Sequence, residues 1–436
     1  MSLRPDHIFR LNLNHMRMQN IYSVIRRSIL VIAVVTAHSF FLSAQTGIFY
    51  YPNPSENYVN NKLMALTEAP NQEIYLLGKL SNASYEKSIP YFCRVDKRGN
   101  LLIEKSISKQ QIYDLSALFI LNNQRVKVFG SRRQGPIFAP WMVTLNSKGD
   151  IIKEKSDYVV YSTIMNDVTD IDGKHLMIAE TKVDNNKLYN INLLKLNAEN
   201  DETLWSKRIK SNLNEEASTI FTLKDGNLLV LGKKYSSDLS DYSPVLYKVN
   251  PNGKPLWRVG IPVPDNFYAQ DITEDSQGNL IYMCSYSKEY MGTNETRVIK
   301  LNSEGQKQSY NVILDISGNG LVMKDNDQFV LYGSNIKVHN KRPITKGKYV
   351  VINSNLKPIY KHEFSKNDKP DSEMPEDVAK NLPTNSDLTT GILLKDGRVA
   401  LAGRIYMPAN PAEANPYGND RNNFALMVIL DESGKF

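Results

Sequence analysis

The side chains best suited to catalysis or metal binding are sparse in this sequence. Its 436 residues include two cysteines and six histidines, and three of the histidines lie beyond the first forty residues. These five residues are Cys93, Cys284, His175, His339 and His362, and they lack the spacing of a zinc site or of a disulfide framework. The motifs G-x-S-x-G, H-E-x-x-H and the P-loop do not occur. We therefore expect no metal, no cofactor and no catalytic residue of these classes.

Three aspartates lie close together in the segment NDVTDIDGK, at Asp167, Asp170 and Asp172. The alternating spacing and the terminal glutamate of a calcium-binding loop are missing, so we expect a solvated turn here. His175 and His362 fall in predicted strands, and we expect both to be structural.

The remaining candidates are tyrosines, one arginine and one histidine in polar segments. Tyrosine and arginine often dominate binding energy, and a tyrosine ring serves sugar stacking and protein anchoring equally well. The candidate ligand-binding residues are Tyr235, Tyr242, Tyr286, Tyr290, His339, Tyr406, Tyr417 and Arg421. Whether they can meet depends on the elements that carry them.

A repeated turn indicates what those elements are. A short pattern recurs along the chain. It consists of an apolar residue, any residue, a second apolar residue, Asn or Asp, two or three further residues and then usually Gly, as in KVNPNGK and KLNSEGQ. Its Asn or Asp residues are Asp96, Asn146, Asn197, Asn250, Asn302, Asn353 and Asp431. Successive spacings are 50 to 53 residues except for the last, which is 78. The period predicts seven repeated units, one of them stretched.

A second column of residues, with one small residue in each unit, has the same period. Upstream of each turn, an apolar strand is predicted to end in a small residue, at Gly78, Gly130, Ala179, Gly232, Cys284, Gly333 and Gly403. Cys284 is therefore expected to be a small buried residue and not a nucleophile. Cys93 falls in the third strand of a different unit, so we expect no disulfide between the two.

Each unit is predicted to contain four antiparallel strands, because Asx-Gly turns separate short apolar or alternating runs. Seven such sheets can bury both faces only by radial stacking, which predicts an all-β, seven-bladed β-propeller. The blades are expected near 58–108, 110–158, 161–210, 212–262, 266–314, 315–365 and 387–436. The last unit stops after its turn, so residues 47–51 (GIFYY) are predicted to supply its fourth strand and close the ring.

Length variation points to one face of this propeller. The connections between second and third strands are longer than the other hairpins, and connections between blades emerge on the same face. The extra residues of the stretched unit, 366–386 and 404–423, also fall there. Long proline-rich loops are often functional or disordered. They form either a lip for a ligand or partner, with Tyr406, Tyr417 and Arg421 as the best candidates, or a lineage-specific surface covering.

The N-terminus has the pattern of a secretory signal peptide. Arg26 and Arg27 precede the apolar run 28–42, and small residues follow up to Ala44, which predicts cleavage before Gln45. The alternative, a membrane anchor, needs about 20 apolar residues, more than the run offers. We expect an exported domain of residues 45–436 in the periplasm, on the outer-membrane surface or secreted, with no transmembrane segment after cleavage.

The charge of the mature chain is close to neutral. Residues 1–44 contain five arginines and one aspartate, so the net charge falls from +7 to about +3 on cleavage. The basic balance therefore gives no argument for nucleic acid as a partner. We expect a monomer that contacts a protein or a glycan.

The hairpins NAENDETLW, ending at Trp205, and NPNGKPLW, ending at Trp257, resemble the strand three to strand four hairpin of PQQ-like and related bacterial secreted propeller repeats. The resemblance covers roughly residues 57–436 and implies blade architecture. Quinoprotein dehydrogenases of that superfamily would add an acidic calcium site and a cofactor-stacking tryptophan, for which no matching pattern occurs. In style, the signal peptide followed by glutamine, the many tyrosines and the Asn-Gly turns resemble an exported Bacteroidetes surface antigen.

Two functions remain open. The first is a noncatalytic exported binding or scaffold protein of the bacterial envelope or surface, which contacts a protein or glycan through one loop-bearing face. The second is an extracellular polysaccharide- or peptide-degrading hydrolase or lyase with its site at the channel mouth. The scarcity of histidine and the absence of motifs favour binding, whereas paired carboxylates at the channel entrance would favour the enzyme.

Overall fold

The computed structural model describes most of the chain after the predicted signal peptide. The described residues are 46–51, 60–82, 87–108, 111–121, 124–156, 159, 162–184, 188–209, 211, 213–236, 242–263, 267–288, 293–324, 326–339, 342–364, 386–408 and 421–435. Residues 46–436 belong to one compact unit. The predicted signal peptide lies outside the described residues.

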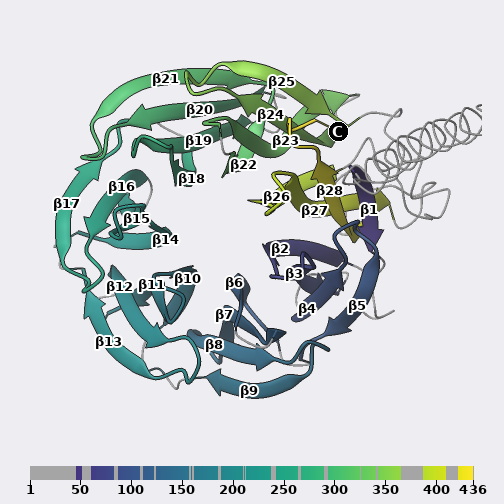
Figure 1. Ribbon diagram of the computed structural model, residues 1–436. Helices are drawn as coiled ribbons and strands as arrows, with labels where there is room; N and C mark the ends of the chain where they lie inside the picture. The colour runs from purple at the N-terminus through teal and green to yellow at the C-terminus, as the bar shows by residue number, and fades with distance from the viewer. Residues whose placement is uncertain are drawn as a thin grey trace, which may run out of the picture. The chain divides into compact units, whose positions relative to one another are not determined.

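The described residues form a ring of seven four-stranded antiparallel blades (Figure 1), as predicted. Blades one to four contain β2 (Asn60–Glu68), β3 (Ile74–Ser81), β4 (Ser88–Val95) and β5 (Leu101–Ser106); β6 (Asp114–Ile120), β7 (Val126–Gln134), β8 (Ile137–Leu145) and β9 (Ile151–Ser156); β10 (Thr163–Asp170), β11 (His175–Val183), β12 (Tyr189–Asn197) and β13 (Thr203–Arg208); and β14 (Glu215–Thr222), β15 (Leu228–Tyr235), β16 (Tyr242–Val249) and β17 (Pro255–Gly260).

The remaining blades complete the circle. Blades five to seven contain β18 (Tyr268–Glu274), β19 (Leu280–Lys288), β20 (Thr293–Leu301) and β21 (Lys307–Leu314); β22 (Ser317–Met323), β23 (Phe329–His339), β24 (Arg342–Ile352) and β25 (Pro358–Glu363); and β26 (Ser386–Leu393), β27 (Val399–Pro408), β28 (Arg421–Leu430) and β1 (Gly47–Tyr51). Every regular element of the described residues is thus a strand. No described segment forms a helix with the length and apolar character needed to cross a membrane.

A separate hydrophobic core fills each of the seven spaces between neighbouring blades. Between blades one and two, for example, Tyr75 and Phe92 pack with Leu118 and Trp141. Both faces of each sheet are buried in this way, which explains why the buried strands lack a strict alternation of polar and apolar residues.

The N-terminal strand closes the ring, as predicted. β1 pairs antiparallel with β28, from Gly47 opposite Ile429 to Tyr51 opposite Ala425. The purple β1 and the strand β28 therefore lie side by side (Figure 1). The Phe49 ring fills the space where a side chain on Gly99 would project, because a Cβ on Gly99 would lie 2.6 Å from that ring.

Ordinary blades contain the same ring-on-glycine packing. Trp205 of β13 lies over Gly253, and Trp257 of β17 lies over Gly305 in the same manner. β1 therefore makes the contacts of a fourth strand.

The small residues of the second column do not end their strands, and that prediction is wrong. β27 continues beyond Gly403, and β19 continues beyond Cys284. Each inner strand carries a β-bulge next to the small residue. A Cβ on Gly403 would lie 1.9 Å from the backbone oxygen of Asp387. The residue is small because a bulged backbone crosses it, not because the strand stops.

The two cysteines behave as predicted. Both are buried and free, and Cys284 lies opposite Ala269 at the bulge of β18. Burial raises the pKa of the Cys284 thiol to about 12, so it is not an activated nucleophile.

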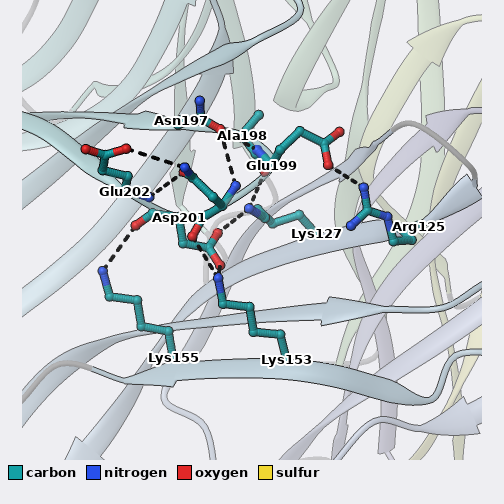
Figure 2. Close-up of polar contacts among 10 residues, drawn as sticks. Arg125, Lys127, Lys153, Lys155, Asn197, Ala198, Glu199, Asp201 and Glu202 are labelled. Atoms are coloured by element: carbon teal, nitrogen blue, oxygen red, sulfur yellow. Dashed lines mark hydrogen bonds and ion pairs between the residues drawn. The ribbon is translucent and has the colours of Figure 1, made fainter.

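The seam between blades two and three has a buried ion pair at Asp201, a turn position at which five other blades have a glycine (Figure 2). Lys127 of β7 is 0% exposed and binds the Asp201 carboxylate and the Ala198 carbonyl. Lys153 of β9 approaches the same carboxylate at 2.6 Å. On the outside, Arg125 pairs with Glu199. The hairpin turn of blade three is thereby fixed to the strands of blade two.

Candidate functional site

The predicted site residues have different outcomes. Tyr235 ends β15, Tyr242 begins β16, and Tyr286 lies in β19. All three are near the connections between second and third strands, on one face of the propeller. Tyr290 and Tyr417 lie outside the described residues.

Three other candidates are placed only by their backbone. Tyr406, Arg421 and His339 lie in β27, β28 and β23, and their side chains are not among those described. Tyr406 pairs with Asn423 of β28, and His339 pairs with Arg342 of β24.

Two segments predicted as loops are partly strand. The hairpin of β23 and β24 runs out to His339 and Arg342, and that of β27 and β28 runs out to Pro408 and Arg421. The β-branched Ile336, Val338 and Ile344 continue the strand pattern among polar neighbours, which favours extended ladders. Residues 366–385 and 409–420 of the predicted lip lie outside the described residues.

A continuous row of four tyrosines crosses the loop-bearing face from blade three to blade five. Tyr189 of β12 lies next to Tyr235, with ring centroids 5.5 Å apart. Tyr235 is 5.8 Å from Tyr242, and Tyr242 is 5.7 Å from Tyr268 of β18. We call these four residues the tyrosine stripe. Tyr268 is 48% exposed and the other three are partly exposed.

Hydrogen bonds hold the first rings of the stripe in place. Asn214, just before β14, accepts the Tyr189 N–H on its side chain at 2.6 Å and the Tyr235 N–H on its backbone oxygen at 2.9 Å. The Tyr235 hydroxyl donates to Glu216 at 2.6 Å. Burial and this carboxylate raise the pKa of Tyr235, so its hydroxyl stays protonated.

Cations accompany the aromatic rings. The Lys233 ammonium lies 5.6 Å from the centroid of Tyr242 and 3.6 Å from Glu216. Beside Tyr268, Phe267 stacks on Tyr286 with centroids 5.5 Å apart. The Arg297 guanidinium lies 4.6 Å from the Phe267 centroid and 2.7 Å from Glu295.

The repeat accounts for only part of the stripe, because Tyr189 and Tyr242 each begin the third strand of their blade whereas Tyr268 begins an inner strand. Among the described residues, most of the exposed large hydrophobic side chains fall into two groups, and four others lie elsewhere on outer strands, at Leu101, Ile151, Tyr310 and Leu314. One is repeated at a bulge of the outer strand in five blades, at Leu102, Ile152, Leu204, Leu256 and Ile359. The other belongs to the loop-bearing face, at Tyr113, Leu188, Leu213 and Tyr268. A feature repeated in most blades reflects the architecture, whereas the second group departs from it and so requires another explanation.

Sequence reasoning missed Tyr189, Phe267 and Tyr268. Tyr189 begins the third strand of its blade, as Tyr242 does in the next blade, so aligning the third strands would have identified it. Tyr268 begins an inner strand directly after a connection between blades.

Two aspartates of the inner strands lie next to bulges. Asp167 of β10 accepts hydrogen bonds from the Thr219 hydroxyl and, at 3.0 Å, from the Ile220 N–H of the next blade. Asp271 of β18 accepts the Leu321 N–H of its next blade at 2.8 Å. Burial raises the pKa of Asp167 to about 6 and that of Asp271 to about 7.

The prediction for the aspartate segment was therefore wrong at one position. Asp170 and Asp172 do form an exposed turn, in which Asp172 also contacts His175 at 2.7 Å. Asp167 instead faces the next blade. The phrases Asp-Val-Thr-Asp from Asp167 and Asp-Ile-Thr-Glu from Asp271 share one position of the repeat, a signal that the sequence did contain. In the described part of the chain, no three His, Cys, Asp or Glu side chains are grouped to hold a metal.

His362 is packed among aromatic rings, whereas the partly exposed His175 contacts Asp172. His362 of β25 lies 5.6 Å from Tyr349 and 5.4 Å from Phe364, measured between ring centroids. Its surroundings are aromatic, which fits a structural role.

No protein-family model matches the chain, and no curated protein matches its sequence. Solved structures with a similar chain path include the α-L-arabinofuranosidase Arb93A from Fusarium graminearum, at 10% identity and a TM-score of 0.45 over 71% of this chain and 98% of that one. Sqt1 from Chaetomium thermophilum, bound to the N-terminus of ribosomal protein L10, matches at 10% identity and 0.43 over 89% and 100%. The β-propeller domain of the Trilobed protease from Pyrococcus furiosus matches at 10% and 0.42 over 80% and 93%. At such values the similarities carry no argument about function.

Proposed function

We propose that the chain is an exported, noncatalytic binding or scaffold protein of the bacterial cell envelope or surface. It contacts a protein or a glycan through the loop-bearing face of the propeller. The proposal includes a mature domain that begins near Gln45 and a location in the periplasm, on the outer membrane or outside the cell. Membership of the PQQ-like propeller superfamily and a Bacteroidetes source are part of the same proposal.

The observation that carries the proposal is the tyrosine stripe. Its rings touch from Tyr189 to Tyr268 across three blades, and Tyr268 leaves about half of its surface open. A partly exposed aromatic row that crosses neighbouring blades is typical of a binding surface. Tyrosine provides a large contact area at a low entropic cost of ordering.

The hydrolase alternative receives less support from the inner-strand carboxyl groups. Asp167 and Asp271 each accept a backbone N–H from the neighbouring blade. Groups used in this way stabilise the ring and are not free to move a proton to a substrate. The raised pKa values follow from burial, which also occurs at structural sites.

The experiment first identifies a binder and then assigns the face. The mature protein is used to pull down envelope material and to probe a glycan array. Any binder found is tested against the double variant Tyr242→Ala, Tyr268→Ala, and against a variant in which 366–386 and 404–423 are shortened to tight turns. As a control, the opposite-face turn at Asn250–Gly253 is altered.

We expect the stripe variant to lose binding while its melting temperature stays unchanged. Loss with the shortened loops would assign Tyr406, Tyr417 and Arg421 to the same surface. Binding that is lost only when the opposite turn is altered would contradict the proposal.

A further inference from the structure

The charged side chains beside the tyrosine stripe and the Phe267–Tyr286 stack are matched in acid–base pairs. Glu216 pairs with Lys233 at 3.6 Å, and Glu295 pairs with Arg297 at 2.7 Å. At the blade-three end, Lys182 lies 3.3 Å from Glu180 and Arg208 lies 4.0 Å from Asp184. These four positive and four negative groups balance one another, so these described pairs by themselves favour neither a polyanion nor a strongly basic segment.

These paired groups are suited to hydroxyl groups. A sugar hydroxyl both donates and accepts, so a pair of neighbouring hydroxyls can donate to Glu216 and accept from Lys233 at once. A proline-rich peptide, the other ligand that aromatic surfaces often bind, offers mainly carbonyl acceptors. It would offer no donor to the remaining lone pairs of the Glu216 and Glu295 carboxylates, which already accept from Tyr235 and Arg297.

Cationic ligands are also disfavoured. One face of Tyr242 already lies under Lys233, and one face of Phe267 lies under Arg297. A ligand ammonium group would meet a like charge at both rings. The more open ring of Tyr268 and the partly exposed ring of Tyr189 remain available for an uncharged apolar surface, such as the C–H face of a pyranose.

The length of the stripe indicates a chain and not a single sugar. Four rings follow one another at centroid separations of 5.5, 5.8 and 5.7 Å, and they belong to three blades. Building on the proposed function, we infer that the tyrosine stripe binds a neutral glycan chain, with rings stacking on the sugars and the acid–base pairs bonding their hydroxyls.

The test is affinity electrophoresis of the mature protein in gels that contain one polymer each. The neutral polymers are β-glucan, xylan, mannan and starch, and the comparison polymers are polygalacturonate and heparin. A proline-rich peptide is tested separately by fluorescence anisotropy. We expect retardation by at least one neutral polymer, with little change between 50 mM and 500 mM NaCl, because such a polymer carries no charge to be screened.

Matched variants decide whether the stripe is responsible. Tyr242→Ala with Tyr268→Ala should weaken binding by about tenfold or more. Tyr113→Ala is the control, because Tyr113 is 45% exposed on the same face but pairs with Phe138 of blade two, outside the stripe. The control should bind like the parent, and all variants should melt at the parent temperature.

The possible failures are distinguishable. Retardation by no neutral polymer, by acidic polymers only, or equally by parent and stripe variant would overturn the glycan inference. If a purified protein partner or the proline-rich peptide binds and the stripe variant loses it, the binding function stands and the glycan inference is wrong. If no ligand of any kind depends on the stripe, both are wrong.

Discussion

The bulged backbone of each inner strand limits the size of the side chain opposite it on the second strand. A Cβ on Gly403 would lie 1.9 Å from the Asp387 backbone oxygen, whereas a Cβ on Gly260 would have no neighbour within 4 Å. Gly403→Ala should therefore lower the free energy of unfolding by about 2 to 4 kcal/mol, because backbone must shift to make room. Urea denaturation measures this.

Gly260→Ala is the matched control for that measurement. It should change stability by less than about 1 kcal/mol, in the stabilising direction, because alanine reduces the entropy of the unfolded chain. Equal effects of the two substitutions would show that close approach of the bulged backbone is not the reason for the column of small residues.

The partly buried carboxyl of Asp271 should make stability depend on pH. Burial, together with the charge of Asp167, raises the pKa of Asp271 from 3.8 to about 7. Two backbone N–H donors act in the opposite direction but do not cancel this rise. The folded state therefore holds its proton more tightly than the unfolded state does. The contribution is fully present below about pH 4 and is lost as the pH rises through 7.

Asp271→Asn provides the test, because asparagine stays neutral at every pH. Relative to the parent, this variant should gain on the order of 2 to 4 kcal/mol of stability between pH 4.5 and pH 8. Its lost hydrogen bond adds an offset that does not vary with pH. Asp170→Asn, in the exposed turn, should leave the shape of the pH profile unchanged. If the free energy of unfolding changed with pH in the same way for the parent and for Asp271→Asn, a raised pKa of Asp271 would be contradicted.

At the scale of the elements, the ion pair of Figure 2 fixes the hairpin of blade three against blade two. Asp201→Asn keeps the size of the side chain but leaves the buried Lys127 ammonium without its main counter-ion. We expect a loss of about 3 kcal/mol in the free energy of unfolding. Lys127→Met combined with Asp201→Asn should recover much of it, since no buried charge then remains.

Glu199→Gln supplies the control at the same seam. It removes the partner of Arg125 in a pair that is about one-third exposed and should cost less than about 1 kcal/mol. A cost equal to that of Asp201→Asn would mean that burial of the lysine is unimportant to this seam.

Because β1 closes the ring, deleting the N-terminal segment that contains it should destabilise the protein. Removing Gln45–Asn53 takes away the fourth strand of blade seven and the Phe49 ring that covers Gly99. The truncated protein should melt at a lower temperature or associate through the exposed edge of β28. Differential scanning calorimetry and light scattering measure the two outcomes.

Removal of Gln45 and Thr46 alone serves as the control, because both precede β1. A synthetic peptide spanning 45–53 should restore part of the lost stability when added to the truncated protein. The closure argument would not survive a truncated protein that melts like the parent and stays monomeric.

For the molecule as a whole, export and closure involve the same end of the chain. Cleavage before Gln45 would leave β1, which begins at Gly47, intact. Intact-mass analysis of protein exported with its own leader should therefore give a mature chain that starts near Gln45. A mass that still includes Arg26 and Arg27 would contradict cleavage, and a start beyond Tyr51 would contradict closure by β1.

The repeat made the architecture predictable from sequence alone. Turn residues such as Asn250 and Asn302 and the short apolar runs between them are local signals, and their period of about fifty residues reinforces each one. The missing fourth strand of the last unit and the unassigned GIFYY segment also predicted closure. Cys284 was correctly identified as a buried member of a column, because six other units show a small residue at the same place.

Only the tertiary structure brought Tyr189 next to Tyr235 and Tyr242 next to Tyr268. These contacts join different blades, so they depend on how neighbouring sheets pack and not on any local pattern. The partial burial of Asp167 and Asp271 has the same origin, because each carboxyl bonds the backbone of the next blade. Local sequence specifies turns and strands, whereas the surface that a ligand meets is assembled from side chains that are 46 and 26 residues apart along the chain.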